Sequence, residues 1–230
     1  HRDLHSFPTR CSSDLNKLKD LAKTDNRIKI INNDKNHGLL YSRAMGILHS
    51  SGEYILNLDP DDEIKDNESL EYLYNQSILS NIDIISFDVF YEKINKIVKC
   101  NYENIFLKQP KLFNSIFYAN NKLRDFFIVN KLIKREIFQQ AYEFFKYEIY
   151  HLKWNYFEDM IWSILVNKYS KSKLCVNKVV YIYNYNEGSL TNKKNEVIEL
   201  RNLFYMHEMY KKLFNIKKYE KYLIAEYHSL

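Results

Sequence analysis

The sequence predicts an α/β fold in which a mostly parallel β-sheet is flanked by helices. Segments with a helical spacing of apolar residues alternate with short runs of branched and aromatic residues, which is typical of a parallel sheet wrapped by helices. The chain also contains 20 Tyr and 14 Phe but only 4 Gly, so we expect regular elements to dominate it. Its 230 residues allow one sizeable domain, alone or with a helical appendage.

The composition is that of an ordinary globular protein, with 46% hydrophobic and 27% charged residues. No apolar run approaches the length needed to span a bilayer. The three cysteines are odd in number and widely spaced, which favours a reducing cytoplasm. The net charge of +5 is concentrated late in the chain, where a basic surface could face an anionic membrane or a phosphorylated substrate. Nucleic-acid binding is disfavoured because no basic stripe interleaves with the aromatic residues.

The first part of the chain is expected to contain a non-native stretch, two helices and a strand between them. Residues 1–13 lack an apolar period and look like a translated sequencing adapter, so we expect them to be a non-native scar. A short helix is predicted from Asp14, which can cap it, and a buried strand over residues 27–31. A second helix is predicted over residues 39–50, ended by Gly52 in a left-handed conformation.

The remaining elements follow from the same rules. Residues 54–58 predict a strand, Asn67 can cap a helix that reaches residue 79, and residues 82–91 predict a long strand with which residues 94–100 pair across a turn. The later elements are a helix opened by Pro110, helices over residues 131–145 and 158–169, a strand over residues 174–185, and a helical tail beyond residue 191.

An acidic stretch, Asp59-Pro60-Asp61-Asp62, directly follows the strand of residues 54–58. In an open α/β sheet, ligands bind at the carboxyl ends of the strands. Close carboxylates repel one another unless a cation or hydrogen-bond donors neutralise them, and oxygen ligands suit Mg²⁺ or Mn²⁺, which can in turn hold phosphate oxygens. By itself the stretch is equally well explained as a solvated acidic turn with Pro60 at its corner.

Six short motifs follow one another along the chain. They are Asn36-His37-Gly38 with Ser42-Arg43-Ala44, Gly52-Glu53-Tyr54-Ile55 with Leu58 to Asp62, Ile82 to Asp88, Asn130 to Arg135, Phe157-Glu158-Asp159, and Tyr181-Ile182-Tyr183 with Ser189-Leu190-Thr191. In this order they resemble the motifs of family 2 glycosyltransferases, which have the Rossmann-like GT-A fold. The resemblance implies a GT-A domain over residues 14–191 and a helical C-terminal segment over residues 192–230. The opening strand of the family, with its first donor-binding Asp, has no clear counterpart, so we expect weak donor binding from a sheet that lacks this strand.

The resemblance implies an inverting enzyme that moves a hexosyl group from a nucleotide-diphosphate sugar to an acceptor hydroxyl with the help of Mn²⁺ or Mg²⁺. It assigns Asp61 to the metal, Asp59 to the ribose or the metal, and Asp62 to a supporting role. Arg43 would meet the nucleotide or its phosphates, and a surface salt bridge is the alternative. Asp159 would be the general base, although a carboxylate in the first turn of a helix is often only a partner of the helix dipole.

The acceptor side is less well defined. Tyr183, Tyr185 and Ser189 could line it, but core packing and a turn are the favoured explanations. The family suggests surface polysaccharide synthesis in the bacterial cytoplasm or peripherally at the inner membrane face, with a glycan or lipid-linked acceptor. The competing hypothesis is a catalytically silent remnant that binds a sugar nucleotide or serves as a scaffold.

Overall fold

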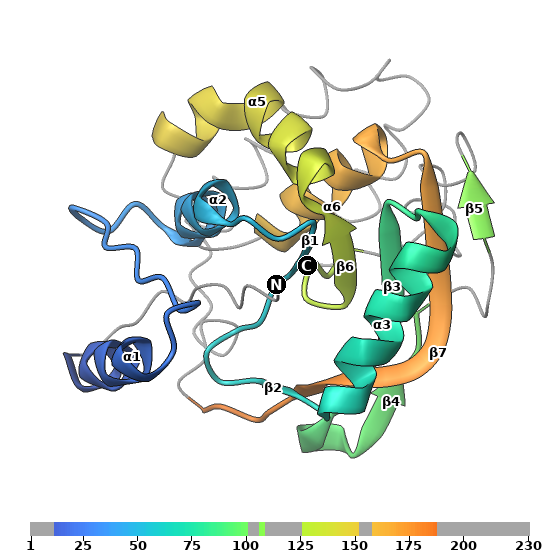
Figure 1. The fold of residues 1–230 in the computed structure, drawn as a ribbon, viewed down its shortest axis with the longest axis horizontal. Coiled ribbons are helices and arrows are strands. Elements are labelled where there is room, and N and C mark those ends of the chain that lie inside the picture. The colour runs from blue at the N-terminus through green and yellow to red at the C-terminus, as the bar shows by residue number, and fades with distance from the viewer. Residues whose placement is uncertain (1–11, 101–105, 109–125, 152–157, 188–230) are drawn as a thin grey trace, which may run out of the picture.

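A sheet flanked by helices forms the body of the protein (Figure 1), so the expected α/β fold is confirmed. The computed structural model describes residues 12–100, 106–108, 126–151 and 158–187. Its elements are α1 (Ser12–Thr24), α2 (Leu39–His49), β1 (Tyr54–Leu56), β2 (Glu63–Ile64), α3 (Asn67–Ser80), β3 (Ile84–Tyr91), the 3-10 helix η1 (Glu92–Ile94), β4 (Lys96–Val98), β5 (Phe106–Lys108), β6 (Lys131–Lys134), α5 (Arg135–His151), α6 (Glu158–Tyr169) and β7 (Ser172–Tyr183). The expected helix at Pro110 and the tail of residues 192–230 lie outside the described residues.

The described strands form a mixed sheet in the order β1-β6-β3-β7-β2, with β4 on β3 and β5 on β7. Among these strands only β3 and β7 pair in parallel, and every other pairing is antiparallel, so the expectation of a mostly parallel sheet is wrong. In particular, β6 is antiparallel to both of its neighbours, β1 and β3. The strands β1, β3 and β7 therefore run in the same direction. Their carboxyl ends point to one side of the sheet, as expected for a ligand-binding edge.

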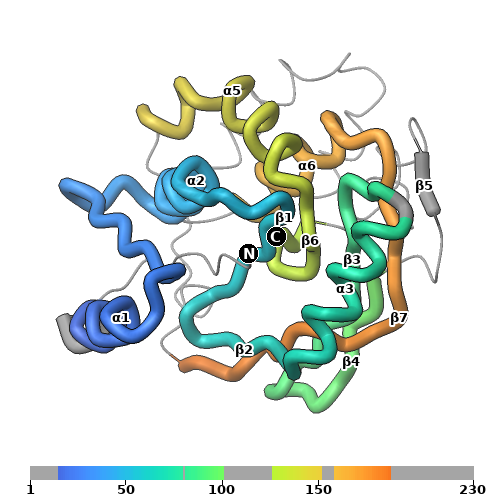
Figure 2. The backbone as a smooth tube through the Cα atoms, viewed as in Figure 1, coloured from blue at the N-terminus to red at the C-terminus, as the bar shows by residue number. Residues whose placement is uncertain are grey.

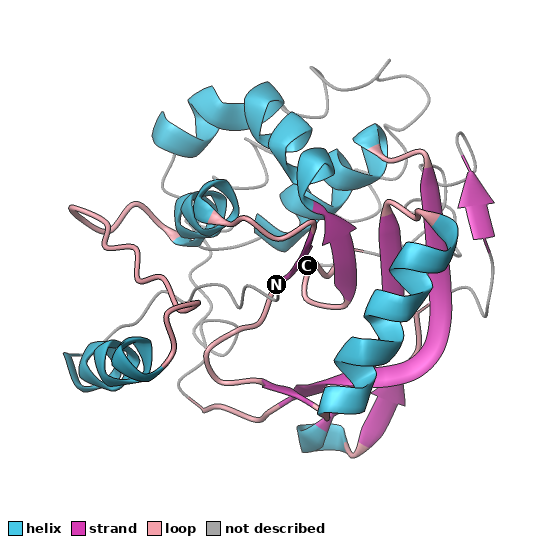
Figure 3. Ribbon diagram, in the orientation of Figure 1, coloured by secondary structure: helices cyan, strands magenta, loops and turns pink. Residues whose placement is uncertain are grey.

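The strand expected over residues 27–31 is wrong. This segment is a loop between α1 and α2 (Figure 3), opened by a turn in which the Ile28 N–H donates to the Asp25 carbonyl. A strand needs a neighbour to complete its hydrogen-bond ladder. Within the described ranges no strand pairs with residues 27–31, so their branched side chains alone do not produce one.

The helix expected to begin at residue 131 is also wrong in its first turn. Lys131–Lys134 forms β6, and α5 begins only at Arg135. Ile133 is aligned with Ile55 on one side and with Ile84 on the other. Because strands on both sides supply hydrogen-bond partners, the tertiary context overrides the local helical preference.

Two helix ends differ from expectation in detail. Gly52 is not left-handed; α2 instead ends at an extended Ser50, whose N–H donates to the Ile47 carbonyl. Among the described glycines it is Gly38 that has a positive φ, 93° at the start of α2, where the missing Cβ makes this conformation accessible. For α3 the cap is Asp66 rather than Asn67, because the Asp66 carboxylate accepts the Ser69 N–H at 2.6 Å.

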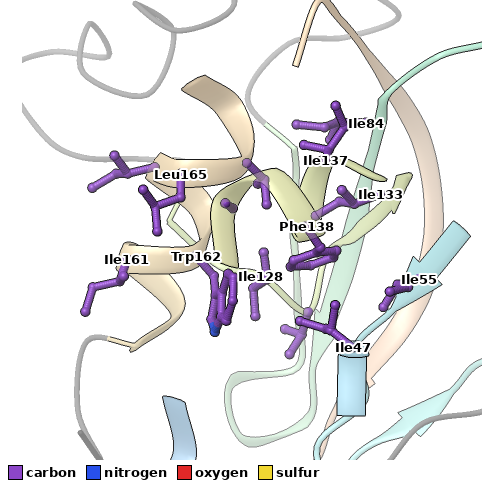
Figure 4. Packing of buried hydrophobic residues seen from close by; sticks show 14 of the residues in the cluster. Ile47, Ile55, Ile84, Ile128, Ile133, Ile137, Phe138, Ile161, Trp162 and Leu165 are labelled. Atoms are coloured by element: carbon purple, nitrogen blue, oxygen red, sulfur yellow. The ribbon is translucent and has the colours of Figure 1, made fainter. Parts of the chain in front are cut away.

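The core lies where α5 and α6 pack on β6 and its neighbours (Figure 4). Phe138 of α5 and Trp162 of α6 meet edge to face, with ring centroids 5.5 Å apart, beside the fully buried Ile133. The helix α2 packs against both α5 and α6, so its inner face is buried next to the start of α6. In the described part of the chain, no helix combines the length and the apolar character needed to cross a membrane.

Candidate functional site

The acidic stretch runs from the end of β1 to β2, where it reaches the carboxyl end of β7 (Figure 2). β2 is antiparallel to β7, with Glu63 opposite Ile182. The buried Tyr181 hydroxyl donates to Asp62 at 2.6 Å and accepts the Asp59 N–H at 3.1 Å. One phenol therefore fixes both ends of the stretch to β7.

Two asparagines beyond β7, Asn184 and Asn186, complete this attachment. The sequence analysis did not identify either of them. The Asn184 N–H donates to Asp62 at 2.9 Å, and the Asn184 side chain donates to the Asp61 carbonyl at 3.0 Å. Asn186 donates to the exposed Asp61 carboxylate at 2.8 Å. Asp62 is 8% exposed, so it acts as an internal support, whereas Asp61 faces solvent.

Arg43 joins the acidic stretch to the start of α6. It projects from α2, is 7% exposed, and donates to Asp59 at 2.7 Å and to Asp159. Its guanidinium is also 3.8 Å from Glu158. The alternative of a surface salt bridge is therefore wrong, because this cation is buried among carboxylates that lie far apart in the sequence.

The charges around Arg43 do not balance if every carboxylate is ionised. Burial and the neighbouring Asp159 raise the pKa of Glu158 to about 8, although Arg43 opposes the shift. Burial also raises the pKa of Asp59 against the pull of Arg43. Burial disfavours the charge on Arg43 itself, but the surrounding carboxylates raise its pKa overall. A protonated Glu158 at neutral pH leaves Arg43 facing two carboxylates, Asp59 and Asp159.

Asp159 and Glu158 face different surroundings although they are adjacent in the first turn of α6. Glu158 is buried, whereas the side chain of Asp159 is 22% exposed. One Asp159 oxygen accepts from Arg43, and the other lies 3.5 Å from the Ile128 N–H, at the long limit of a hydrogen bond. The second oxygen is therefore held less tightly than the first.

A buried lysine beside Asp159 was not singled out by the sequence. Lys131, at the start of β6, is fully buried and donates to the Phe127 carbonyl and, at 2.9 Å, to Asn130. Burial lowers the pKa of Lys131 to about 7, while the Asp159 carboxylate partly counters that shift. The contacts of Lys131 hold the turn whose Ile128 N–H approaches Asp159.

Of the three residues expected on the acceptor side, the structure describes Tyr183 and Tyr185. Tyr183 stacks on Tyr91, and Tyr185 is exposed with the Lys93 ammonium 4.4 Å from its ring centroid. Tyr183 is partly buried and packs against the hydrophobic core, as the favoured explanation expects, whereas Tyr185 is exposed. Ser189 lies outside the described residues.

The carboxylates of the acidic stretch fit a metal site that is completed by substrate and water, but not a site made of protein ligands alone. No group of three or more His, Cys, Asp or Glu side chains able to hold a metal occurs within the described ranges. Asp61 offers an exposed carboxylate, while Asp59 and Asp62 are engaged by Arg43 and Tyr181. This set suits a Mg²⁺- or Mn²⁺-like ion that takes one or two protein carboxylates and completes its shell with substrate phosphates and water. It does not suit a cage made of protein ligands alone.

Comparison with known proteins identifies relatives of both sequence and fold. The sequence model of Glycosyl transferase family 2 matches residues 12–141. EpsH of Bacillus subtilis (strain 168), whose name carries a provisional glycosyltransferase assignment, is 25% identical over 177 residues, which cover 76% of this chain and 49% of EpsH. The cholesterol galactosyltransferase of Borreliella burgdorferi is 32% identical over 120 residues, 48% of this chain and 33% of that protein.

The fold resembles that of S. aureus TarS residues 1–349, solved in complex with UDP-GlcNAc. The TM-score is 0.57 at 16% sequence identity, over 78% of this chain and 49% of that one. The chain thus spans about half or less of the length of each of these proteins.

Proposed function

Because the chain belongs to glycosyl transferase family 2, we propose that it transfers a sugar from a nucleotide-diphosphate sugar to an acceptor hydroxyl, with inversion at the anomeric carbon. The observation that carries this proposal is the position of Arg43. It joins Asp59, from the stretch that follows β1, to Asp159, from the start of α6. A donor-side carboxylate and a candidate base thereby share one buried cation. The TarS structure with UDP-GlcNAc supports a nucleotide-sugar donor for this fold.

On the donor side, Asp61 is the proposed metal ligand. A bound Mn²⁺ or Mg²⁺ would act as a Lewis acid that relieves the negative charge of the leaving diphosphate. Asn186 orients the Asp61 carboxylate, and Asp62, held by Tyr181 and Asn184, supports the stretch from within. Asp59, fixed by Arg43, is directed to the ribose of the donor.

On the acceptor side, Asp159 is the proposed general base. The acceptor hydroxyl loses its proton as it attacks, and a carboxylate within hydrogen-bond reach can take that proton. The Arg43 guanidinium fixes one Asp159 oxygen, so the oxygen near the Ile128 N–H is the one proposed to receive the proton. A single displacement needs one base and no covalent nucleophile, which agrees with inversion.

The wider setting is proposed on the family alone. It comprises a hexosyl donor and a glycan or lipid-linked acceptor. The process would be surface polysaccharide synthesis at the cytoplasmic face of the membrane. The rival is a silent domain that binds a sugar nucleotide without transferring the sugar.

The test is a panel of nucleotide-diphosphate sugars with Mn²⁺, with release of the nucleoside diphosphate as the readout. We expect Asp159→Asn to lower turnover by about 10²–10⁴-fold while the donor dissociation constant stays nearly unchanged. Asp34→Asn, an exposed aspartate paired with His37, is the matched control and should behave as the wild type. Donor binding without turnover in the wild type would favour the silent domain. Loss of donor binding or unfolding in Asp159→Asn would make this residue structural.

A further inference from the structure

Lys131 belongs to the motif of residues 130–135, to which the proposed function gives no role. It is the first residue of β6, and its side chain is fully buried. Since side chains alternate along a strand, Lys131 and Ile133 share one face of the sheet, the face that α5 and α6 cover (Figure 4). Burying an ammonium is costly unless negative charge and hydrogen-bond acceptors compensate for it. A lysine at this position therefore needs partners that a surface lysine does not.

The ammonium of Lys131 joins the two ends of a turn, residues 127–130, which we name the Lys131 turn. It donates to the Phe127 carbonyl at one end and, at 2.9 Å, to the Asn130 side chain at the other. The two residues between them are buried in the hydrophobic core. Because one buried group joins both ends of the turn, the position of the turn depends on Lys131.

The Lys131 turn lies against the proposed base. The Ile128 N–H is 3.5 Å from one carboxylate oxygen of Asp159, while Arg43 donates to the other oxygen. A contact at that distance is weak, so a small shift of the turn would break it. Asp159 is therefore held from two sides, directly by Arg43 of α2 and through the turn by Lys131 of β6.

A second observation connects Lys131 to Asp159. Burial lowers the pKa of Lys131 to about 7, and the charge of Asp159 is the largest of the influences that oppose this shift. Cys175 and Cys100 also lie within electrostatic reach of Lys131 and act in the same direction more weakly. The negative charge that most favours the ammonium at this position is thus the charge of the proposed base.

Lys134, at the other end of β6, has a different set of partners. It is also buried, and it forms an ion pair with Asp83 at 3.1 Å and donates to the Asn81 carbonyl at 3.2 Å. Because Asp83 has no part in the proposed site, we expect Lys134 to contribute to folding alone. The two lysines of this strand allow a purely structural role to be separated from an effect on the base.

We propose that Lys131 is a positioning residue for the transfer reaction and that it acts on Asp159 through the Lys131 turn. The inference rests on the proposed function, which makes Asp159 the base, and adds to it a residue that acts without touching donor or acceptor. Lys131 holds Ile128 against Asp159, and this contact orients the oxygen that receives the proton of the acceptor hydroxyl. Loss of this orientation slows the chemical step, whereas donor binding, which is proposed at the acidic stretch, is retained.

The first test is a double-mutant cycle in turnover. Transfer from the active donor is measured for the wild type, Lys131→Met, Asp159→Asn and the double variant. Methionine keeps an unbranched side chain but donates no hydrogen bond. We expect Lys131→Met to lower kcat by about 10–10²-fold, with the donor KM changed by less than about twofold. In the Asp159→Asn background the same change should lower kcat by no more than about twofold, because residues that act as a unit are not additive.

Lys134→Met is the matched control, since it also removes a buried lysine from β6. When rates are referred to the concentration of folded protein, its kcat should stay near that of the wild type. Equal losses of kcat in Lys131→Met and Lys134→Met would overturn the inference. An undiminished effect of Lys131→Met in the Asp159→Asn background would overturn it as well.

The second test is a titration that needs no change at Lys131 and no turnover. NMR of protein isotope-labelled at the lysine Cε follows the Lys131 signal with pH. We expect this signal to titrate at a lower pH in Asp159→Asn than in the wild type, because the charge that favours the ammonium is removed. Asp83→Asn, which removes the partner of Lys134, is the control and should leave the Lys131 titration unchanged.

The two tests separate this inference from the proposed reaction. An identical Lys131 titration in Asp159→Asn and the wild type would overturn the inference whether or not the protein transfers a sugar. A wild type that shows the expected shift but transfers nothing would contradict the proposed reaction and support the contact between Lys131 and Asp159.

Discussion

Arg43 is the residue on which the charge balance of the site depends. A buried ion pair contributes little net stability, but removing one partner leaves the others as uncompensated buried charges. Arg43 has Asp59, Asp159 and Glu158 around it and is 7% exposed. Its planar fork serves two aspartates at once, which the single ammonium of a lysine cannot reproduce.

We therefore expect Arg43→Met to lower the free energy of unfolding by about 3–5 kcal/mol. Arg43→Lys should lose less stability, yet it should also lose most of the transfer activity because Asp159 is no longer held. Urea unfolding followed by circular dichroism measures the first effect. The control is Arg27→Met, since the Arg27 side chain is 55% exposed and forms an ion pair with Asp25, two residues away. Equal losses in Arg27→Met and Arg43→Met would contradict the central role of Arg43.

Glu158 makes stability depend on pH. The folded protein holds a proton on Glu158 up to a pKa of about 8, while an unfolded glutamic acid releases it near 4.5. Between these values the folded state binds more protons, so raising the pH favours unfolding. The contribution of this group is fully present below pH 4.5 and is lost as the pH rises through about 8.

The expected result is a melting temperature that falls less steeply between pH 5 and 8 in Glu158→Gln than in the wild type. The amide keeps the shape of the protonated acid and cannot ionise. Glu71→Gln, on the exposed surface of α3, is the control and should leave the slope unchanged. Thermal melts at several pH values measure the difference, and identical slopes in all three proteins would show that Glu158 does not bind a proton preferentially in the folded state.

At the scale of elements, the acidic stretch is positioned by β7 rather than by the strand that precedes it. β1 ends at Leu56, and the stretch then crosses to β2, which pairs with β7. The buried Tyr181 hydroxyl forms hydrogen bonds with both Asp59 and Asp62. Asp61 is thus held in place through bonds made by residues on either side of it.

Tyr181→Phe tests this attachment. Loss of one hydroxyl leaves a buried Asp62 with fewer donors, which should lower stability by about 1–3 kcal/mol. It should also weaken Mn²⁺-dependent binding of the nucleoside diphosphate, as measured by calorimetry. Tyr54→Phe is a matched control, because the Tyr54 hydroxyl donates to the Ile82 carbonyl at 2.9 Å away from the acidic stretch. Both variants should lose stability, but only Tyr181→Phe should lose affinity; equal affinity in the two would show that Tyr181 is purely structural.

At the scale of the whole molecule, the site is assembled from segments that lie far apart in the sequence. The helix α2, the stretch after β1, the start of α6 and the end of β7 each contribute one part, and packing of α2 on α5 and α6 brings them together. A ligand that contacts several of these parts in the folded state only should stabilise the entire domain.

Thermal melts with and without a nucleoside diphosphate and Mn²⁺ measure this coupling. At a ligand concentration about 100 times the dissociation constant, binding adds about 2.7 kcal/mol, which for a domain of this size raises the melting temperature by about 5–10 °C. Uridine and guanosine diphosphates are the first probes. Asp61→Asn should remove the Mn²⁺-dependent part of the rise, whereas Asp66→Asn should keep it, because Asn is as good a cap for α3 as Asp. Equal loss in both variants would remove Asp61 from the metal site.

The sequence by itself determined the α/β class and the elements with strong local patterns, and it supplied the residues proposed for the site. The helical spacing that predicts α2 and α3 and the branched residues of β3 depend on neighbours within a few positions, so they can be recognised without a structure. The family order of motifs likewise pointed to Arg43, Asp61 and Asp159 before any contact was known.

Only the tertiary structure decided how these residues meet. Arg43 and Asp159 are 116 residues apart, and Asp62 and Asn184 are 122 apart, so no local period connects them. The strand β6 and the loop of residues 27–31 both show that a strand forms only where a neighbouring strand completes its hydrogen-bond ladder. Lys131–Lys134 becomes a strand because neighbours on both sides complete its ladder, and residues 27–31 do not because they lack such a neighbour among the described strands. A strand, a buried ion pair and a site each depend on partners that folding brings close, and that proximity is not encoded in any short stretch of sequence.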